Sequence, residues 1–148
     1  MRVSTPSAAR LVLLAALVPT FTSAAPPPAL RAQDAWVRAA PGVDVAAAYL
    51  TLHNGGTQPV VVSGVSSPAA GAAMIHETTL VNGQATMRAH EPLRIAPGET
   101  VRFAPGGLHI MLTLKRPLAP GDEVPLVLQL EGGASLEVTA RVRALGDS

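Results

Sequence analysis

Short runs in which apolar residues alternate with others, separated by glycine and proline, constrain the fold of this chain more than any other feature. One run places Val124, Leu126, Leu128 and Leu130 at every second position. Successive side chains of an extended strand point to opposite faces, so this pattern predicts a strand with one buried face. The 148 residues include 13 Gly and 14 Pro, which repeatedly end such runs. Many short strands with this punctuation predict an all-β sandwich or barrel.

Ten segments carry these strand signals, and no segment after the first 24 residues shows a convincing helical stripe. The segments are residues 34–38, 46–53, 59–65, 73–80, 84–89, 92–95, 100–103, 109–114, 124–130 and 136–142. We expect Trp36 to anchor the core. The turn at Pro97-Gly98 predicts that the two segments on either side of it pair with each other. Periodicity alone leaves other immunoglobulin-like sandwiches open as alternatives.

The first 24 residues predict a secretory signal peptide. A basic start is followed by an apolar core from Leu11 to Val18 and by small residues up to Ala25. We expect a signal peptide over 1–24, a flexible proline-rich leader over 25–33, a β-sandwich domain over 34–143 and a short tail over 144–148. No other apolar run approaches the roughly 20 residues of a transmembrane helix. The mature chain is therefore expected to be exported, soluble and not inserted in a membrane.

Charge and cysteine content exclude several classes of function. Without the two arginines of the predicted signal, nine Lys and Arg remain against ten Asp and Glu. No basic run indicates a nucleic-acid surface. The chain has no Cys, which excludes disulfides, thiolate metal sites, a cysteine nucleophile and a cysteine-linked lipid anchor. The apolar core must therefore stabilise the domain alone.

The segment from 73 to 89 carries a hairpin signal. Asn82-Gly83 supplies the two positive φ angles that a two-residue type I′ turn requires. With this turn Thr78 faces Met87 and His76 faces Ala89. His76 and Met87 then lie on one face as diagonal neighbours, within reach of long side chains. A change of one residue in the loop would place them on opposite faces.

A second pair of side chains follows the Gly-Gly turn at 106–107. His109 and Met111 lie two residues apart in an expected strand, so both point to one face while Ile110 points to the other. A site at the start of a strand can open to solvent. His53, in contrast, is expected on the surface and away from any site.

Together these segments supply two imidazoles and two thioethers, from His76, Met87, His109 and Met111. Such soft and borderline donors suit Cu(I). Zinc sites use Cys, His, Asp or Glu, calcium and magnesium need several oxygens, and a blue-copper centre needs a Cys thiolate. A neutral site can release Cu(I) to a stronger, thiolate-bearing acceptor. The donor chemistry therefore predicts a copper carrier.

Further ligands stay open at this stage. Met74, two residues before His76, is a candidate spare donor, although a single Met in a strand is more often a core residue. His90 is a candidate additional Cu(II) ligand. Glu77 or Glu91 could hydrogen-bond a ligating imidazole, and solvated carboxylates are the simpler interpretation.

The donor spacing also resembles a known motif. Ten residues separate His76 from Met87, twenty-one separate Met87 from His109, and one separates His109 from Met111. This spacing is similar to the copper-binding motif of the PCuAC family of periplasmic copper chaperones. The resemblance runs from about residue 34 to residue 142. It includes Asp34-Ala35-Trp36-Val37-Arg38, Asn54-Gly55-Gly56, Ser66-Ser67-Pro68-Ala69, Ile75-His76-Glu77-Thr78, Gly106-Gly107-Leu108-His109-Ile110-Met111-Leu112, Lys115-Arg116-Pro117-Leu118 and Gly121-Asp122-Glu123-Val124-Pro125-Leu126.

The resemblance implies a cupredoxin-like Greek-key β-sandwich in which His76, Met87, His109 and Met111 bind Cu(I). It also implies a periplasmic metallochaperone that supplies the binuclear copper site of cytochrome c oxidase. The copper-bearing oxidase subunit and a Sco-type assembly protein would be its partners. Some family members carry a His- and Met-rich C-terminal tail, whereas residues 143–148 contain no such donors. We therefore expect one principal site.

Two other classes remain as alternatives to this carrier, which is not expected to be an enzyme. Copper oxidases typically need three or more imidazoles at each reactive centre, and the donors for a second centre are absent. No Gly-x-Ser-x-Gly segment supports a hydrolase. A metal-free interaction or adhesion module would instead use exposed edge strands.

Overall fold

The computed structural model describes residues 29–146, which form ten β-strands and no helix. The strands are β1 (Leu30–Ala39), β2 (Val45–Asn54), β3 (Val60–Ser66), β4 (Ala70–Val81), β5 (Gln84–Ala89), β6 (Leu93–Ile95), β7 (Thr100–Arg102), β8 (Leu108–Leu114), β9 (Glu123–Leu130) and β10 (Ser135–Arg143). The all-β prediction is confirmed, and every expected segment contains a strand. The predicted signal peptide and the first part of the predicted leader lie outside the described residues. No helix that could cross a membrane occurs in the part of the chain that the structure describes.

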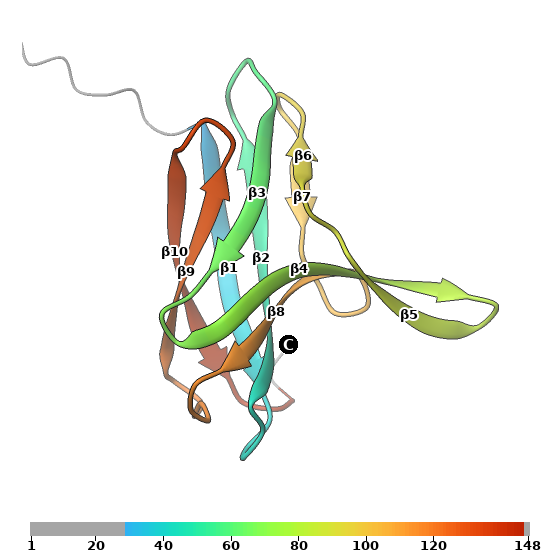
Figure 1. The fold of residues 1–148 in the computed structure, drawn as a ribbon, viewed down its shortest axis with the longest axis vertical. Coiled ribbons are helices and arrows are strands. Elements are labelled where there is room, and N and C mark those ends of the chain that lie inside the picture. Colours follow the sequence, from blue (N-terminus) through green and yellow to red (C-terminus); the bar gives the residue numbers. More distant parts are fainter. Residues whose placement is uncertain (1–28, 147–148) are drawn as a thin grey trace, which may run out of the picture.

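The strands pair in one mixed order, β5-β4-β8-β2-β1-β10-β9-β3-β6, and β7 also pairs with β2. β1 and β10 run parallel, whereas their other neighbours are antiparallel. In Figure 1, β1, β9 and β10 stand together on one side, and β4 and β8 sweep across the lower part of the body. The ordered strands thus fold over one another and enclose a single interior.

One apolar core fills this interior. Its buried side chains come from most of the strands, and β5 contributes none of them among the described residues. The largest fully buried side chains are those of Leu30, Leu50, Leu52, Ile75, Ile95, Ile110, Leu112, Leu126 and Leu128. Burial of one such side chain stabilises the fold by about 1.5–3 kcal/mol. The alternating runs of the sequence therefore do form the stabilising core.

The first strand corrects the predicted domain boundary. β1 begins at Leu30 rather than at residue 34, so four residues assigned to the flexible leader belong to the β-domain. Leu30 is buried and pairs with Asn54 of β2. The boundary was misplaced because the proline run at 26–28 suggested a longer extended leader than the chain has.

Trp36 is not the core anchor that we expected. A bulge lies between Gln33 and Trp36, where Asp34 has a φ of 53°. Because side chains alternate with a period of two, an extra residue exchanges the inner and outer faces of the strand. Val37 is consequently fully buried, and Trp36 packs outside against Tyr49, with ring centroids 4.6 Å apart.

The predicted pairing of segments 92–95 and 100–103 is also wrong. β6 pairs with β3, and β7 pairs with β2. The turn between them does form, since Glu99 N donates a hydrogen bond to Ala96 O at 3.0 Å. Asn54 N in turn donates to Glu99 O at 3.0 Å. This bond ties the turn to the end of β2 and directs β7 along that longer strand.

The predicted hairpin forms with the predicted register. Thr78 faces Met87 and His76 faces Ala89. The two residues of Asn82-Gly83 have φ angles of 52° and 77°, as the expected turn requires. The outer part of β4 and β5 extends well beyond the body of the domain (Figure 1). This hairpin therefore has few neighbours except near its base, where β4 meets β8.

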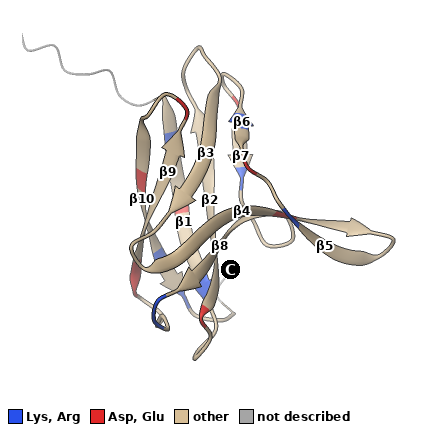
Figure 2. Ribbon diagram, viewed as in Figure 1, with Lys and Arg blue, Asp and Glu red and all other residues tan. Residues whose placement is uncertain are grey.

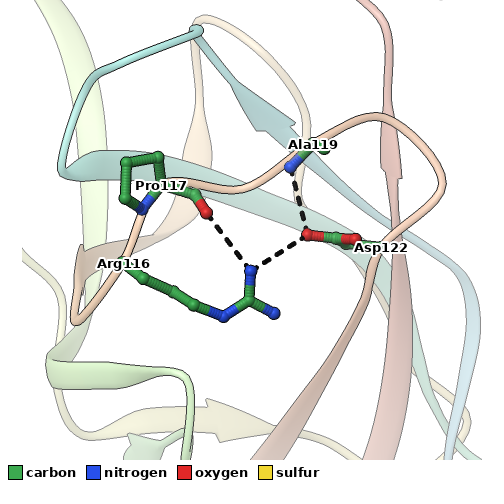
Figure 3. A network of polar contacts seen from close by, with 4 residues as sticks. All are labelled: Arg116, Pro117, Ala119 and Asp122. Carbon is green, nitrogen blue, oxygen red and sulfur yellow. Dashed lines mark hydrogen bonds and ion pairs between the residues drawn. The ribbon is translucent and has the colours of Figure 1, made fainter.

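No Lys, Arg, Asp or Glu of residues 29–146 is buried, and Figure 2 marks the positions of these residues along the ribbon. The loop between β8 and β9 is closed by one polar network (Figure 3). Asp122 accepts hydrogen bonds from Ala119 N at 3.1 Å and from Arg116 at 3.5 Å, and Arg116 also donates to Pro117 O at 3.4 Å. The network fixes the connection between β8 and the core strand β9.

Candidate metal centre

β4 and β8 bring two predicted donors side by side. The strands pair antiparallel, with His76 opposite His109 and Met74 opposite Met111. Residues that face each other in this way have Cβ atoms about 4.5–5.5 Å apart on the same face. The two imidazole rings meet edge to face, with centroids 5.9 Å apart. Long-range pairing has thus gathered residues that the sequence separates widely.

Met87 and Met111 lie beside this pair of rings. Thr78, two residues beyond His76 on β4, faces Met87, so Met87 shares the face of His76. Met87, Met111 and His109 all line one hollow of about 330 Å³. His76 adjoins the hollow through its ring contact with His109. The structure therefore brings all four predicted donors to one face of β4, β5 and β8.

The turn before β8 holds His109 in one orientation. Its side chain is buried, and Nδ1 lies 3.1 Å from Gly107 O. A carbonyl oxygen only accepts, so Nδ1 carries the proton and Nε2 keeps its lone pair. The same carbonyl oxygen accepts a hydrogen bond from Thr78 N at 3.1 Å, which ties the turn to β4. Nε2 of His109 is therefore preset as a metal ligand.

His76 has a buried nitrogen without a partner. Among the described residues its Nδ1 is the one buried side-chain nitrogen or oxygen that makes no hydrogen bond. Folded proteins satisfy nearly all such atoms, and an unsatisfied one costs about 1–3 kcal/mol. A metal ion bound at this nitrogen would remove that cost. The unpartnered nitrogen of His76 thus supports a metal site independently of the donor spacing in the sequence.

Among the described residues the rest of the hollow is lined by groups other than carboxylates. Tyr49 and Arg38 lie on its wall. Burial raises the pKa of the Tyr49 hydroxyl, and the charge of Arg38 lowers it by a smaller amount. Tyr49 therefore stays neutral in the ordinary pH range. Within residues 29–146 no three His, Cys, Asp or Glu side chains come together in a metal-binding group.

His90 lies on the opposite side of the hairpin. Its Nδ1 is 3.1 Å from Glu77 Oε2, and Glu77 points away from the face that His76 uses because the two are adjacent in a strand. Glu91 Oε1 accepts a hydrogen bond from Ile75 N at 2.9 Å. Glu77 therefore contacts the imidazole of His90, and Glu91 contacts the backbone of β4, rather than the imidazole of His76 or His109.

Met74 and His53 differ in position. Met74 faces Met111, is 49% exposed and shares a small second hollow with it. His53 lies at the far end of β2, where its Nδ1 is 2.9 Å from Thr100 Oγ1. The structure thus places Met74 with the donors and His53 away from them, as expected for a surface residue.

Donor spacing did not reveal the wall of the hollow. Ala47 of β2 faces Met111, and its small side chain leaves room beside the thioether. The run Ala46-Ala47-Ala48 was the available signal, because small residues in a strand leave a depression. Arg38 of β1 reaches the hollow only through the pairing of β1 with β2, which no local sequence pattern predicts, whereas Tyr49 lies on β2 two residues after Ala47 and therefore on the same face.

Comparison with known proteins shows the family. A family model described as "Putative lipoprotein LpqE-like" matches residues 30–142. "Putative lipoprotein Lxx21020" of Leifsonia xyli subsp. xyli is 38% identical over 116 residues, which cover 77% of this chain and 69% of that protein. The chain belongs to the LpqE-like family.

Solved structures place this LpqE-like chain among PCuAC proteins. The solution structure of Cu(I)-bound DR1885 from Deinococcus radiodurans is 33% identical, covers 84% of this chain and 83% of its own, and has a TM-score of 0.61. The apo PCuAC domain of PmoF1 is 25% identical with a TM-score of 0.64, and covers 78% of this chain and 94% of its own. The copper-bound PCuAC domain of PmoF2, 22% identical with a TM-score of 0.64 and coverage of 78% and 93%, shares the fold. The predicted resemblance to PCuAC and its cupredoxin-like fold is confirmed.

Proposed function

We propose that this LpqE-like chain is a Cu(I)-binding metallochaperone with one principal site formed by His76, Met87, His109 and Met111. One observation supports the proposal best. The register of β4 against β5 and β8 gathers two imidazoles and two thioethers on one face. Copper is the cargo of this site rather than a resident cofactor, and the chain is not proposed to be an enzyme.

The donor set favours cuprous copper over other ions. Thioether and imidazole are soft and borderline ligands, which suit Cu(I). Among residues 29–146 the site offers no carboxylate cluster for calcium or magnesium and no third His, Cys, Asp or Glu side chain for zinc. The Nε2 of His109 and the unpartnered Nδ1 of His76 would supply two nitrogen ligands.

The exposure of the Met87 thioether supports a carrier rather than a permanent metal centre. Met87 is 49% exposed and comes from the projecting hairpin. An acceptor thiolate can therefore approach the ion from the side of β5. A Cu–S bond to the acceptor forms as the bond to the Met87 thioether breaks, and the copper stays Cu(I) throughout. Neutral thioether ligands make this exchange favourable in the direction of the thiolate.

Two relatives extend this argument. Copper-bound structures exist for DR1885, as its Cu(I) form, and for the PmoF2 domain. DR1885 is 33% identical to this chain over most of both chains. Copper as the cargo of the present chain agrees with that relationship.

The finer parts of the proposal concern place and partners. We assign residues 1–24 to a signal peptide and the mature chain to the periplasm. The acceptors are the copper-bearing subunit of cytochrome c oxidase, at its binuclear site, and a Sco-type assembly protein. The resemblance to PCuAC chaperones and the exchange chemistry of the site support these assignments.

Competition between the mature chain and a Cu(I) chelator tests the proposal. We expect one equivalent of Cu(I) to bind and then to move to a thiolate-bearing acceptor on mixing. Binding no tighter than that of an unrelated His-bearing β-sandwich would refute the proposal. Tight binding without transfer to the soluble copper domain of the oxidase subunit would limit the role to general copper handling.

A metal-free interaction module is the second candidate. It is favoured by the tip of the projecting hairpin, where Leu80 is 77% and Val81 45% exposed on the part of β4 that extends beyond its register with β8. A partner that binds the copper-free chain and the copper-loaded chain equally well would support this candidate over the carrier.

A further inference from the structure

Three arginines from three different strands converge on a second hollow. Arg38 of β1, Arg102 of β7 and Arg143 of β10 line a cavity of about 290 Å³, together with the ring of Trp36. The cavity contains none of the four proposed copper ligands, although Arg38 also lines the hollow of the candidate metal centre. The two hollows are therefore neighbours that share one side chain.

The strand register places two of these arginines directly against each other. β1 and β10 pair in parallel, and Arg38 is the register partner of Arg143. Like charges on adjacent strands destabilise a sheet. Within residues 29–146 no carboxylate forms an ion pair with Arg38, Arg102 or Arg143, although the chain forms such pairs elsewhere, at Arg141 with Glu123 for example. No described acidic side chain therefore neutralises these arginines through an ion pair.

Aromatic rings hold two of the guanidinium groups in place. The guanidinium carbon of Arg143 lies 4.7 Å from the centroid of the Trp36 ring, and that of Arg38 lies 5.8 Å from it. Arg38 is also 6.0 Å from the Tyr49 ring. Stacking of this kind orients the group and leaves its N–H donors free. The outward position of Trp36, which the β1 bulge produces, is what makes this arrangement possible.

The charged residues of the lining give the cavity a net positive charge. Asp34 is the one acidic residue in the lining, against three arginines. Leu50, Phe103 and Pro105 are apolar parts of the lining. Guanidinium forks match the geometry of carboxylate and phosphate oxygens, and such bonds are stronger than those between neutral groups. The site is thus basic, partly apolar and built to face an anion.

We propose that the cavity formed by Trp36, Arg38, Arg102 and Arg143 binds an oxyanion, a carboxylate or a phosphate, between the stacked guanidinium groups. The bound anion reduces the repulsion between the charges of Arg38 and Arg143 and accepts hydrogen bonds from their free N–H groups. This proposal is independent of copper binding, since it uses no thioether and no imidazole.

Trp36 provides the readout, because it is the one tryptophan of the chain. The mature chain, free of copper, is titrated with malonate in one series and with inorganic phosphate in another, at constant ionic strength. We expect the Trp36 emission to change along a saturating curve, because the anion draws the Arg143 guanidinium against the ring. The series with the lower half-saturation identifies which oxyanion the site prefers. No saturable change in either series would overturn the proposal.

Variants separate a built site from general attraction of anions. Arg143→Gln and Arg102→Gln should each weaken binding by about tenfold or more, since each removes a charged hydrogen-bond donor. Arg143→Lys keeps the charge but loses the fork, and should also weaken binding. Arg141→Gln is the matched control, because Arg141 lies on the same strand, pairs with Glu123 and does not line the cavity. Equal losses in the control and in Arg143→Gln would overturn the proposal.

Arg102→Gln also guards against a folding artefact. Arg102 lines the cavity from β7, whereas the arginines stacked on the Trp36 ring are Arg38 and Arg143. Thermal unfolding of each variant shows whether the domain is intact. Intact Arg102→Gln that binds malonate and phosphate as tightly as the unaltered chain would contradict the proposal, whatever the behaviour of the Arg143 variants.

Discussion

The β9–β10 hairpin and the β4–β5 hairpin are both antiparallel, but they use their apolar residues in opposite ways. In β9 the side chains of Val124, Leu126 and Leu128 are fully buried. In the outer part of β4–β5, Leu80 is 77% and Met87 49% exposed. The β9–β10 hairpin lies between β1 and β3 in the strand order, whereas β5 lies at one end of that order.

The difference shows that alternating apolar residues contribute to stability in one part of this chain and not in the other. Where a strand has neighbours on both sides, the alternating residues stabilise the fold. Where it projects from the body, as β5 does in Figure 1, exposed apolar and thioether groups contribute little to stability. The two hairpins therefore differ in how much their apolar residues contribute to stability, and four predictions test that difference.

The largest expected effect is a loss of stability in β9. Leu126→Ala removes a fully buried side chain and should lower the free energy of unfolding by about 2–5 kcal/mol. Urea unfolding followed by circular dichroism measures this change. A change in the free energy of unfolding as small as that of a surface substitution would show that Leu126 of β9 does not stabilise the core.

Next in size is a loss of copper affinity without a loss of fold. Met111→Leu and Met87→Leu should each weaken Cu(I) binding by about tenfold or more, equal to about 1.4 kcal/mol. The free energy of unfolding should change by less than about 1.5 kcal/mol, because Leu and Met have similar volumes. Chelator competition and urea unfolding give the two values.

His53→Ala is the control for this pair, since His53 lies at the other end of β2. It should leave Cu(I) affinity unchanged. If both Met variants titrate like the unaltered chain, the assignment of four ligands is wrong.

A smaller effect is expected at the hairpin turn. Gly83 has a φ of 77°, so Gly83→Ala strains the turn by about 1 kcal/mol. The strain should raise amide hydrogen exchange in β5 and leave exchange in β9 unchanged, because among residues 29–146 β5 pairs with β4 alone and β9 lies far from it in the strand order. Exchange that rises equally in both strands would mean that the hairpin and the core unfold together.

The smallest effect is expected at the tip. Leu80→Ser should change the free energy of unfolding by no more than about 0.5 kcal/mol, because the side chain is already in solvent. Its Cu(I) affinity should equal that of the unaltered chain. A loss of several kcal/mol in urea unfolding would place Leu80 in a packed interface and remove the contrast with Leu126.

Local chemistry made the hairpin and half of the candidate site predictable from the sequence. Asn82-Gly83 determined the register of β4 against β5, and with it the shared face of His76 and Met87. The spacing of His109 and Met111 likewise predicted one face of β8. Each of these inferences depends only on residues close together in the chain.

Long-range pairing was not predictable in the same way. That His76 faces His109 depends on the pairing of β4 with β8, and no local pattern encodes it. The bulge before Trp36 inverted the expected face of that residue, because one extra residue is invisible in a strand pattern. The contact between Arg38 and Arg143 also depends on long-range pairing, because it arises from the parallel pairing of the first and last strands.

X-ray absorption of the mature chain loaded with one equivalent of Cu(I) tests the central claim most directly. The technique reports the neighbours of the ion by element, so it separates sulfur from nitrogen and oxygen. The four-ligand site predicts two sulfur and two nitrogen neighbours, with one sulfur lost in Met111→Leu. A spectrum with nitrogen and oxygen neighbours alone would contradict the account.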